Sequence, residues 1–324
     1  MIYKTLIEII LAASLVQVFP VDAGVIESYA KLPQAGFSSR VNIEEVMRTL
    51  YPALPLANDV ARVPKKIRPE SLGVVTAATT ALVADAASGA ILFEKNTDEA
   101  RSIGSMTKLM TALVFLSGNP DLNTQTFLAS SDLREGGKQH VPTGRLVTIK
   151  DLLLASLVSS DNSATAALAR LSGFSESDFV ARMNEKAAEI SMVSTTFVDP
   201  TGLSPNNRST APDLVALIRT ALKNDDIRFA TEQATATITD TDGNSYQLEN
   251  TNELLTGFIN QDPYKIVGGK TGYLPEAGYC LGVQMEKDGS KDIFVVVLGS
   301  DSVQGRLKDV KALAVWAYQT FEWK

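Results

Sequence analysis

Apolar runs separated by turn residues divide the chain from about residue 79 onward into strands and helices. Two short apolar runs, 80–84 and 90–94, flank Ala87-Ser88-Gly89 and predict a β-hairpin. A second hairpin is predicted for 235–241 and 245–248 around Asp242-Gly243, and a third for 279–285 and 293–298 around Lys287-Asp288-Gly289. Strands are therefore expected near both ends of this region.

Between these strands the apolar pattern is helical. Residues 105–118 are apolar on almost every side, as is typical of a buried helix. Two shorter helices follow, one ending at Val158 and one spanning 163–171, and Ser175 and Thr210 are capping residues that begin two more. A last helix is expected over 302–320. This order predicts an α+β fold, with one mostly antiparallel sheet completed by both ends of the domain and a separate helical subdomain.

The first 76 residues have a different character. Lys4, the apolar stretch 9–19 and the small residues around Ala23 are typical of an export signal, so we predict a signal peptide over 1–23, with an uncleaved anchor as the alternative. Residues 24–76 contain five prolines and one short predicted helix, 42–50, and are interpreted as an arm or linker. The protein is expected to be exported and extracytoplasmic, in the periplasm or cell wall.

Composition narrows the classes of function. The chain has 324 residues, 45% hydrophobic and 21% charged, with a net charge of −7, which argues against a nucleic-acid partner. Its single cysteine, Cys280, lies in an apolar run and is interpreted as a core residue. Its single histidine, His140, lies in a polar, glycine-bearing stretch and is interpreted as a loop residue. One histidine excludes a zinc-binding H-E-x-x-H helix and argues against a Ser-His-Asp triad, so no metal or cofactor is expected.

Three short motifs carry the candidate chemistry. They are Ser105-Met106-Thr107-Lys108, then Ser160-Asp161-Asn162, then Lys270-Thr271-Gly272. Each alone has an ordinary explanation: a helix cap with a surface lysine, a turn between helices, and the end of a strand. Together and in this order they supply a nucleophile, a base, a proton carrier and a carboxylate clamp.

The local context of each motif supports this interpretation. Ser105 lies at a helix N-terminus and Lys108 follows on the same face, where burial disfavours its charge. Gly272 ends a strand-like segment and permits close approach of a ligand backbone. A phosphate-binding loop at Gly269-Lys270-Thr271 is excluded, because Tyr264 stands where that motif requires glycine.

The chain resembles the serine D-Ala-D-Ala peptidases, the low-molecular-mass penicillin-binding proteins, over about residues 79–320. Further matching segments are 85–89, 108–112, 200–203, 209–213, and 270–273 with 276–279. The resemblance implies a five-stranded antiparallel sheet flanked by helices, an all-α subdomain that holds the second motif, and a catalytic domain over 77–324.

The resemblance also implies roles for the motif residues. Ser105 would attack the carbonyl between two D-alanines and form an acyl-enzyme, with Lys108 as its base and Ser160 as proton carrier. Asn162 would hold the substrate amide, Lys270 and Thr271 would bind the terminal carboxylate, and the backbone N–H groups of Ser105 and Tyr273 would form the oxyanion hole. The implied partners are peptidoglycan peptides ending in D-Ala-D-Ala, with β-lactams as covalent inhibitors.

The main prediction is a D,D-carboxypeptidase, with cleavage of peptide cross-links by an endopeptidase as the alternative. A serine β-lactamase is a minor alternative, because the segment 199–203 has no glutamate to activate a deacylating water. A wall-binding protein without activity is another, although its nucleophile, base and clamp are intact. No C-terminal membrane anchor is seen in the sequence.

Overall fold

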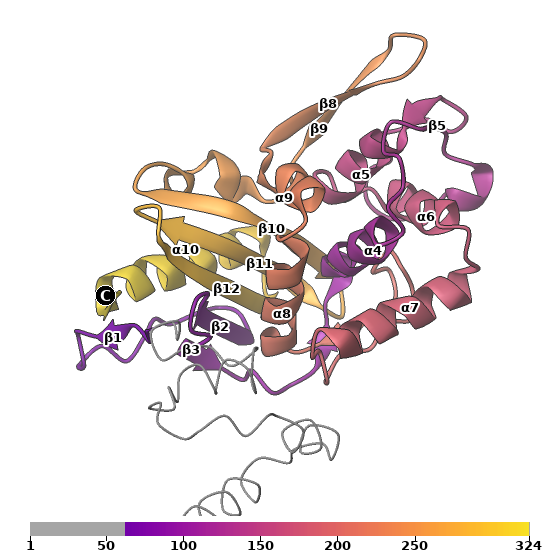
Figure 1. Ribbon diagram of the computed structural model, residues 1–324. Coiled ribbons are helices and arrows are strands. Elements are labelled where there is room, and N and C mark those ends of the chain that lie inside the picture. Colours follow the sequence, from indigo (N-terminus) through magenta and orange to yellow (C-terminus); the bar gives the residue numbers. More distant parts are fainter. Residues whose placement is uncertain (1–61, 324) are drawn as a thin grey trace, which may run out of the picture. The chain divides into compact units, whose positions relative to one another are not determined.

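The computed structural model describes residues 62–323. At the centre of this part lies a five-stranded antiparallel sheet, which confirms the predicted fold class (Figure 1). Its strands, in spatial order, are β10 (Tyr264–Leu274), β11 (Gly278–Lys287), β12 (Lys291–Ser300), β2 (Thr80–Asp85) and β3 (Ile91–Lys95). The two ends of the domain thus meet where β12 pairs with β2, and β10 is an edge strand.

Both faces of the sheet are buried. Phe294, Val296 and Leu298 of β12 pack into one core, and the alternate residues Ile293, Val295 and Val297 pack into another. This alternation explains why the strand is apolar throughout. The helix α10 (Val303–Thr320) covers one face and α8 (Ala211–Ala221) lies on the other, between the sheet and the helical part (Figure 1).

The helical part surrounds α4 (Thr107–Leu116), which is almost completely buried. Around it lie α5 (Ile149–Leu157), α6 (Asn162–Leu171), α7 (Glu176–Glu189) and α9 (Asp225–Glu232). Ser175 and Thr210 accept N-capping hydrogen bonds, as predicted. The helix α9 was not predicted, although Asn224 accepts two hydrogen bonds at its start and is a recognisable cap.

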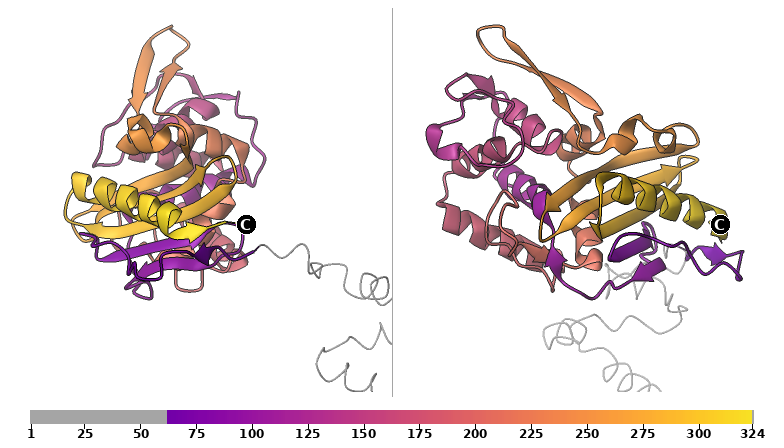
Figure 2. Two further views of the ribbon diagram at one scale, coloured as in Figure 1. Left: turned by 90° about the vertical axis from the view of Figure 1, so that its left-hand side faces the viewer. Right: turned by 180° about the vertical axis from the view of Figure 1, so that it is seen from behind.

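Short elements complete the described part. The hairpin of β8 (Thr235–Thr239) and β9 (Ser245–Glu249) projects from the body in every view (Figure 2). Two-residue strand pairs are β4 (Arg101–Ser102) with β7 (Arg208–Ser209), β5 (Gln125–Thr126) with β6 (Val147–Thr148), and β1 (Lys65–Lys66) with β13 (Phe321–Glu322). The 3₁₀ helices are η1 (Gly104–Met106), η2 (Ser130–Asp132), η3 (Glu253–Thr256) and η4 (Phe258–Asn260).

One predicted boundary differs from the structure. The Lys270-Thr271-Gly272 motif lies inside β10 rather than at the end of a strand, because pairing with β11 continues to Leu274 opposite Gly278. Glycines around the motif conceal this continuation from the sequence pattern.

Residues at the end of the predicted arm lie against the final helix. Trp316 Nε1 of α10 donates a hydrogen bond of 2.7 Å to Ser71 Oγ, and the Asp309 carboxylate accepts from the backbone N–H groups of Ala77 and Ala78. The predicted signal peptide, 1–23, and the predicted helix at 42–50 lie outside the described residues. Within 62–323, no helix combines the length and apolar character needed to cross a bilayer.

Candidate active site

The first motif places a serine beside a lysine at the start of the buried helix. Ser105 lies in η1 and Lys108 in the first turn of α4, and Lys108 Nζ is 3.0 Å from Ser105 Oγ. The lysine is completely buried, whereas the serine is partly accessible. Ser105 therefore reaches the cleft while Lys108 stays away from water.

The contacts of Lys108 can be satisfied by a neutral amine. Its Nζ donates to Asn162 Oδ1 at 2.7 Å and to the Thr201 carbonyl at 2.6 Å. A neutral amine has two N–H groups and one lone pair, so the lone pair is left for the Ser105 hydroxyl. Burial lowers the pKa of Lys108 to about 7, although the carboxylates of Asp199 and Asp161 act in the opposite direction. The geometry suits a general base that accepts the serine proton.

A turn that begins at Asp199, which the sequence analysis did not assign to the site, holds the Thr201 carbonyl in place. Asp199 Oδ1 accepts from the backbone N–H groups of Thr201 and Gly202, and Asp199 Oδ2 accepts from Ser204. Gly202 has φ +87°, and a Cβ there would lie 2.2 Å from the Gly104 carbonyl oxygen. The turn that Asp199 stabilises therefore packs closely against the backbone of Gly104, the residue before Ser105.

The second motif connects α5 and α6 at the cleft. Ser160 lines the cleft in a left-handed conformation, φ +61°, which is a strained state for serine, and its hydroxyl makes no hydrogen bond within 62–323. Both ends of the Asn162 amide are occupied by contacts within the protein. Its Oδ1 accepts from Lys108, and its Nδ2 donates to the Gly136 carbonyl at 2.6 Å. In this structure Asn162 positions Lys108.

The third motif contributes a buried cation on the edge strand. Lys270 Nζ has only long contacts of 3.4–3.5 Å, to Thr251 and Thr271, and forms no ion pair in the described part of the chain. Burial lowers the pKa of Lys270 well below its usual value, and the charges of Lys108 and Arg306 lower it further. An anion bound here would offset this unfavourable burial.

Arg306 is a second cation at the same place that forms no ion pair with any described residue. It is 6% exposed, and its guanidinium donates only to backbone carbonyls, those of Gly272, Cys280 and Thr251, at 3.3–3.4 Å. Its Nε has no hydrogen-bond partner among the described residues. The sequence analysis missed this residue, although a polar side chain on the inner face of the final helix was a detectable signal.

Gly272 and Tyr273 continue β10 along the nucleophile. A Cβ on Gly272 would lie 2.2 Å from the Ile103 carbonyl oxygen, so no larger residue fits between β10 and the segment before Ser105. Tyr273 N is 2.8 Å from the position that a Cβ on Gly104 would occupy. The backbone of Tyr273 therefore lies next to that of the nucleophile, where an oxyanion hole is expected.

These residues surround a cleft of about 740 Å³ between the helical part and β10. Ser105, Ser160, Asn162 and the segment 271–273 all line it, while Lys108 and Lys270 lie beneath its floor. The cleft is also lined by residues that the sequence analysis did not assign to it: Gly136, Gly137, Lys138, His140, Gln247, Glu249, Thr251 and Arg306. His140 is a loop residue, as predicted, and Cys280 is buried, as predicted.

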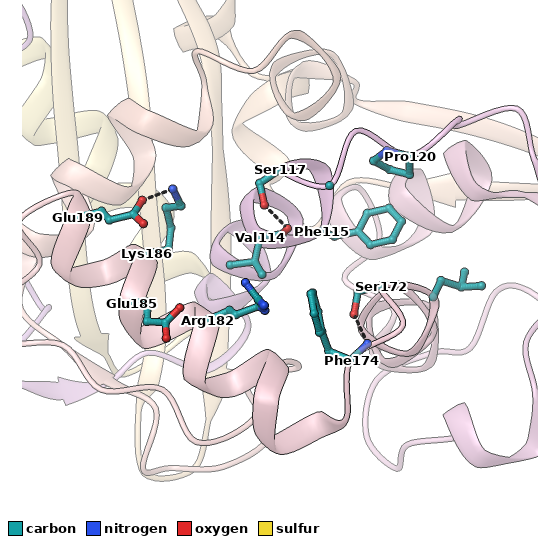
Figure 3. A pocket seen from close by; sticks show the side chains of 12 residues that line it. Val114, Phe115, Ser117, Pro120, Ser172, Phe174, Arg182, Glu185, Lys186 and Glu189 are labelled. Atoms are coloured by element: carbon teal, nitrogen blue, oxygen red, sulfur yellow. Dashed lines mark hydrogen bonds and ion pairs between the residues drawn. The ribbon is translucent and has the colours of Figure 1, made fainter.

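A second hollow, of about 350 Å³, lies between α4, α6 and α7 (Figure 3). The Arg182 guanidinium stacks over the Phe174 ring at 3.9 Å, and Lys186 pairs with Glu189. No motif residue lines this hollow, and it offers no nucleophile beside a base. Of these two hollows, only the first cleft is lined by residues of the three motifs.

Comparison with known proteins agrees with this geometry. Residues 67–302 match the family model described as D-alanyl-D-alanine carboxypeptidase. The chain is 36% identical over 193 residues to a D-alanyl-D-alanine endopeptidase of Haemophilus influenzae, and 30% identical over 251 residues to the D-alanyl-D-alanine carboxypeptidase DacF of Bacillus subtilis. These matches cover 59% and 76% of this chain, but 64% and 63% of the relatives, which is just under two thirds of their length.

Among solved structures, the DD-transpeptidase of Streptomyces K15 has the same fold. It superposes with a TM-score of 0.71 at 27% identity, over 77% of this chain and all of that one.

Proposed function

Because the chain belongs to the D-alanyl-D-alanine carboxypeptidase family, we propose that it is a serine peptidase that removes the last residue from peptidoglycan stem peptides ending in D-Ala-D-Ala. One observation carries this proposal: Ser105 lies beside a buried lysine of lowered pKa and opens into a cleft whose two buried cations, Lys270 and Arg306, form no ion pair within residues 62–323. A peptide with a free terminal carboxylate fits both features.

In the first step, Ser105 Oγ attacks the carbonyl of the penultimate D-alanine and its proton passes to Lys108 Nζ. Lys270 and Arg306 hold the terminal carboxylate, and Thr271 adds a hydroxyl donor. The backbone N–H groups of Ser105 and Tyr273 stabilise the negative oxygen.

Collapse of this intermediate breaks the C–N bond, and Ser160 relays a proton to the departing amine. Water then hydrolyses the acyl-enzyme. A β-lactam carries a carboxylate and an amide in a similar arrangement, so it would acylate Ser105 in the same way. Family members act on the cell wall, and we accordingly place this activity outside the cytoplasm.

The test is release of D-alanine from a synthetic stem peptide. Wild-type protein should release D-alanine and form a covalent penicillin adduct detectable by mass spectrometry, and Ser105→Ala should do neither. An adduct on Ser105→Ala, or no release by the wild type, would refute the proposal. Conservative replacement of the second hydroxyl, Ser160→Ala, should lower the rate without removing the adduct.

A further inference from the structure

Asn207 is completely buried against the start of the Asp199 turn (199–204). Its Oδ1 accepts from the backbone N–H groups of Val198 at 2.7 Å and Asp199 at 3.2 Å. Its Nδ2 donates to the Asp199 carbonyl at 2.8 Å and to Thr107 Oγ1 at 3.1 Å. An amide offers two acceptor sites and two donors, so each of them has a partner here. Neither an aspartate nor an apolar side chain could make all four of these hydrogen bonds.

Asn207 is also bonded to the chain on both sides of the nucleophile. Its backbone carbonyl accepts from the N–H group of Ile103, two residues before Ser105, at 3.2 Å. Its Nδ2 reaches Thr107, two residues after Ser105, and the Thr107 hydroxyl donates onward to the Gly104 carbonyl at 2.8 Å. One buried residue therefore connects the turn to the backbone on either side of Ser105.

The turn meets α4 at two further places. Thr111 Oγ1 donates to the Pro200 carbonyl, and Lys108 Nζ donates to the Thr201 carbonyl at 2.6 Å. Since Asp199, Pro200 and Thr201 follow one another, a displacement of the first residue would displace the other two carbonyls as well. The Thr201 carbonyl occupies one N–H group of the amine, so its position helps to determine where the lone pair of a neutral Lys108 points.

We propose that Asn207 is a positioning residue, which holds the Thr201 carbonyl where it orients Lys108 for proton transfer. This inference rests on the proposed serine peptidase, in which Ser105 gives its proton to that lysine. Asn207 does not line the cleft, so it acts through its hydrogen bonds to the turn and to α4 and not by contact with a substrate.

The charged groups that act on Lys108 come from the turn, from the start of α6 and from β10. The carboxylates of Asp199 and Asp161 both raise its pKa, whereas the buried Lys270 carries a charge of the same sign. A loosened turn would hold neither the Asp199 carboxylate nor the Thr201 carbonyl close to the amine, and the loss of either disfavours the ammonium form. The midpoint of acylation against pH should then fall below that of the wild type.

The test measures the rate of penicillin acylation against pH for the full chain and its variants. Asn207→Ala should lower the plateau rate at high pH about tenfold and move the midpoint to lower pH. Thr107→Val removes only the hydroxyl that lies between Asn207 and the Gly104 carbonyl, and the side chain keeps nearly the same shape. It should change both quantities in the same direction, but by less.

The control variant is Asn260→Ala. It also deletes an asparagine side chain that makes two hydrogen bonds to the backbone, one of them at Ile266 in β10, and Asn260 does not line the cleft. It should leave the plateau rate and the midpoint unchanged.

The shift of the midpoint distinguishes positioning of Lys108 from a purely structural role. A lower plateau together with a lower midpoint supports the inference. A lower plateau with the wild-type midpoint, or acylation equal to that of the control, overturns it. If Asn207→Ala does not fold, Thr107→Val decides between the same results. Failure of the proposed function is a different result, in which the wild type forms no covalent penicillin adduct and both proposals are refuted.

Discussion

At the scale of single residues, the site depends on what burial does to two lysines. Lys108 has two carbonyl acceptors and one hydroxyl around its nitrogen, contacts that a neutral amine satisfies when the hydroxyl donates, and burial lowers its pKa to about 7. Lys270 Nζ has no acceptor closer than 3.4 Å within residues 62–323. The sequence identified both residues by motif and predicted the burial of Lys108 from its apolar helix, but it did not reveal the Thr201 carbonyl, because that contact spans 93 positions.

The first prediction concerns the pH dependence of acylation. Lys108 accepts a proton only when neutral, and its pKa is about 7, so the rate of penicillin acylation should rise with pH and be half-maximal near that value. Below it, the rate should fall about tenfold per pH unit. Rapid-mixing measurements from about pH 5.5 to 8 check this. A rate that is flat or decreases over that range contradicts Lys108 as the base.

The second prediction concerns the carboxylate clamp. Lys270→Ala should lower kcat/KM about a hundredfold for a peptide with a free terminal carboxylate, since it removes a charge-assisted hydrogen bond in a buried site. The same peptide with a terminal amide is the control, because it never had that interaction. The variant should therefore lose most of the wild-type preference for the free acid. An undiminished preference would show that the lysine does not bind the carboxylate.

At the scale of elements, close backbone contacts position the catalytic groups. The Asp199 turn, the segment before Ser105 and β10 approach so closely that Gly202 and Gly272 have no room for a Cβ. The apolar pattern predicted the neighbouring helices and strands to within a few residues. It could not predict these contacts, because periodicity describes the faces of an element and not the loops that meet at its end.

The third prediction separates this steric effect from backbone strain. Gly202 and Gly243 have nearly the same conformation, φ +87° and +86°, but a Cβ at Gly202 meets the Gly104 carbonyl at 2.2 Å while one at Gly243 meets nothing within 4 Å. Both alanine variants should lose about 1 kcal/mol of stability from the positive φ. Only Gly202→Ala should also slow penicillin acylation, by more than about tenfold, because it displaces the backbone at Ser105. Equal acylation by the two variants would exclude this role for the turn.

At the scale of the whole molecule, the cleft lies where the helical part meets the edge of the sheet. Arg306 from α10 lines it and Lys108 from α4 and Lys270 from β10 lie beneath its floor, so the three cations come from elements that are distant in sequence. The order of predicted elements was sufficient to predict the sheet and the helical subdomain. It was insufficient to predict that the β8–β9 hairpin borders the cleft, because a sequence indicates that β8 pairs with β9 but not in which direction the hairpin projects.

The last prediction follows from burying two lysines in one fold. The folded-state pKa of Lys108, about 7, is far below the usual 10.5, and that of Lys270 is lowered in the same direction. Between these values the unfolded chain holds protons that the folded protein has released, so the free energy of unfolding should increase with pH. Each lysine contributes at most about 1.4 kcal/mol per pH unit. Above pH 9 this increase should weaken, because burial raises the pKa of Cys280 to about 11. The unfolded chain then loses the thiol proton at a lower pH than the folded protein does, which lowers the free energy of unfolding as pH rises.

Urea denaturation at about pH 7, 8 and 9 measures this slope. Lys108→Met should reduce this slope by the contribution of one proton. The variant also loses the hydrogen bonds to Asn162 and Thr201, which changes its stability but not the slope. Lys308→Met is the matched control, since it removes an exposed lysine of α10 with the same change in net charge, and it should retain the wild-type slope. If the free energy of unfolding depended on pH in the same way in both variants, Lys108 would keep its proton in the folded protein. It could then not act as the base proposed for Ser105.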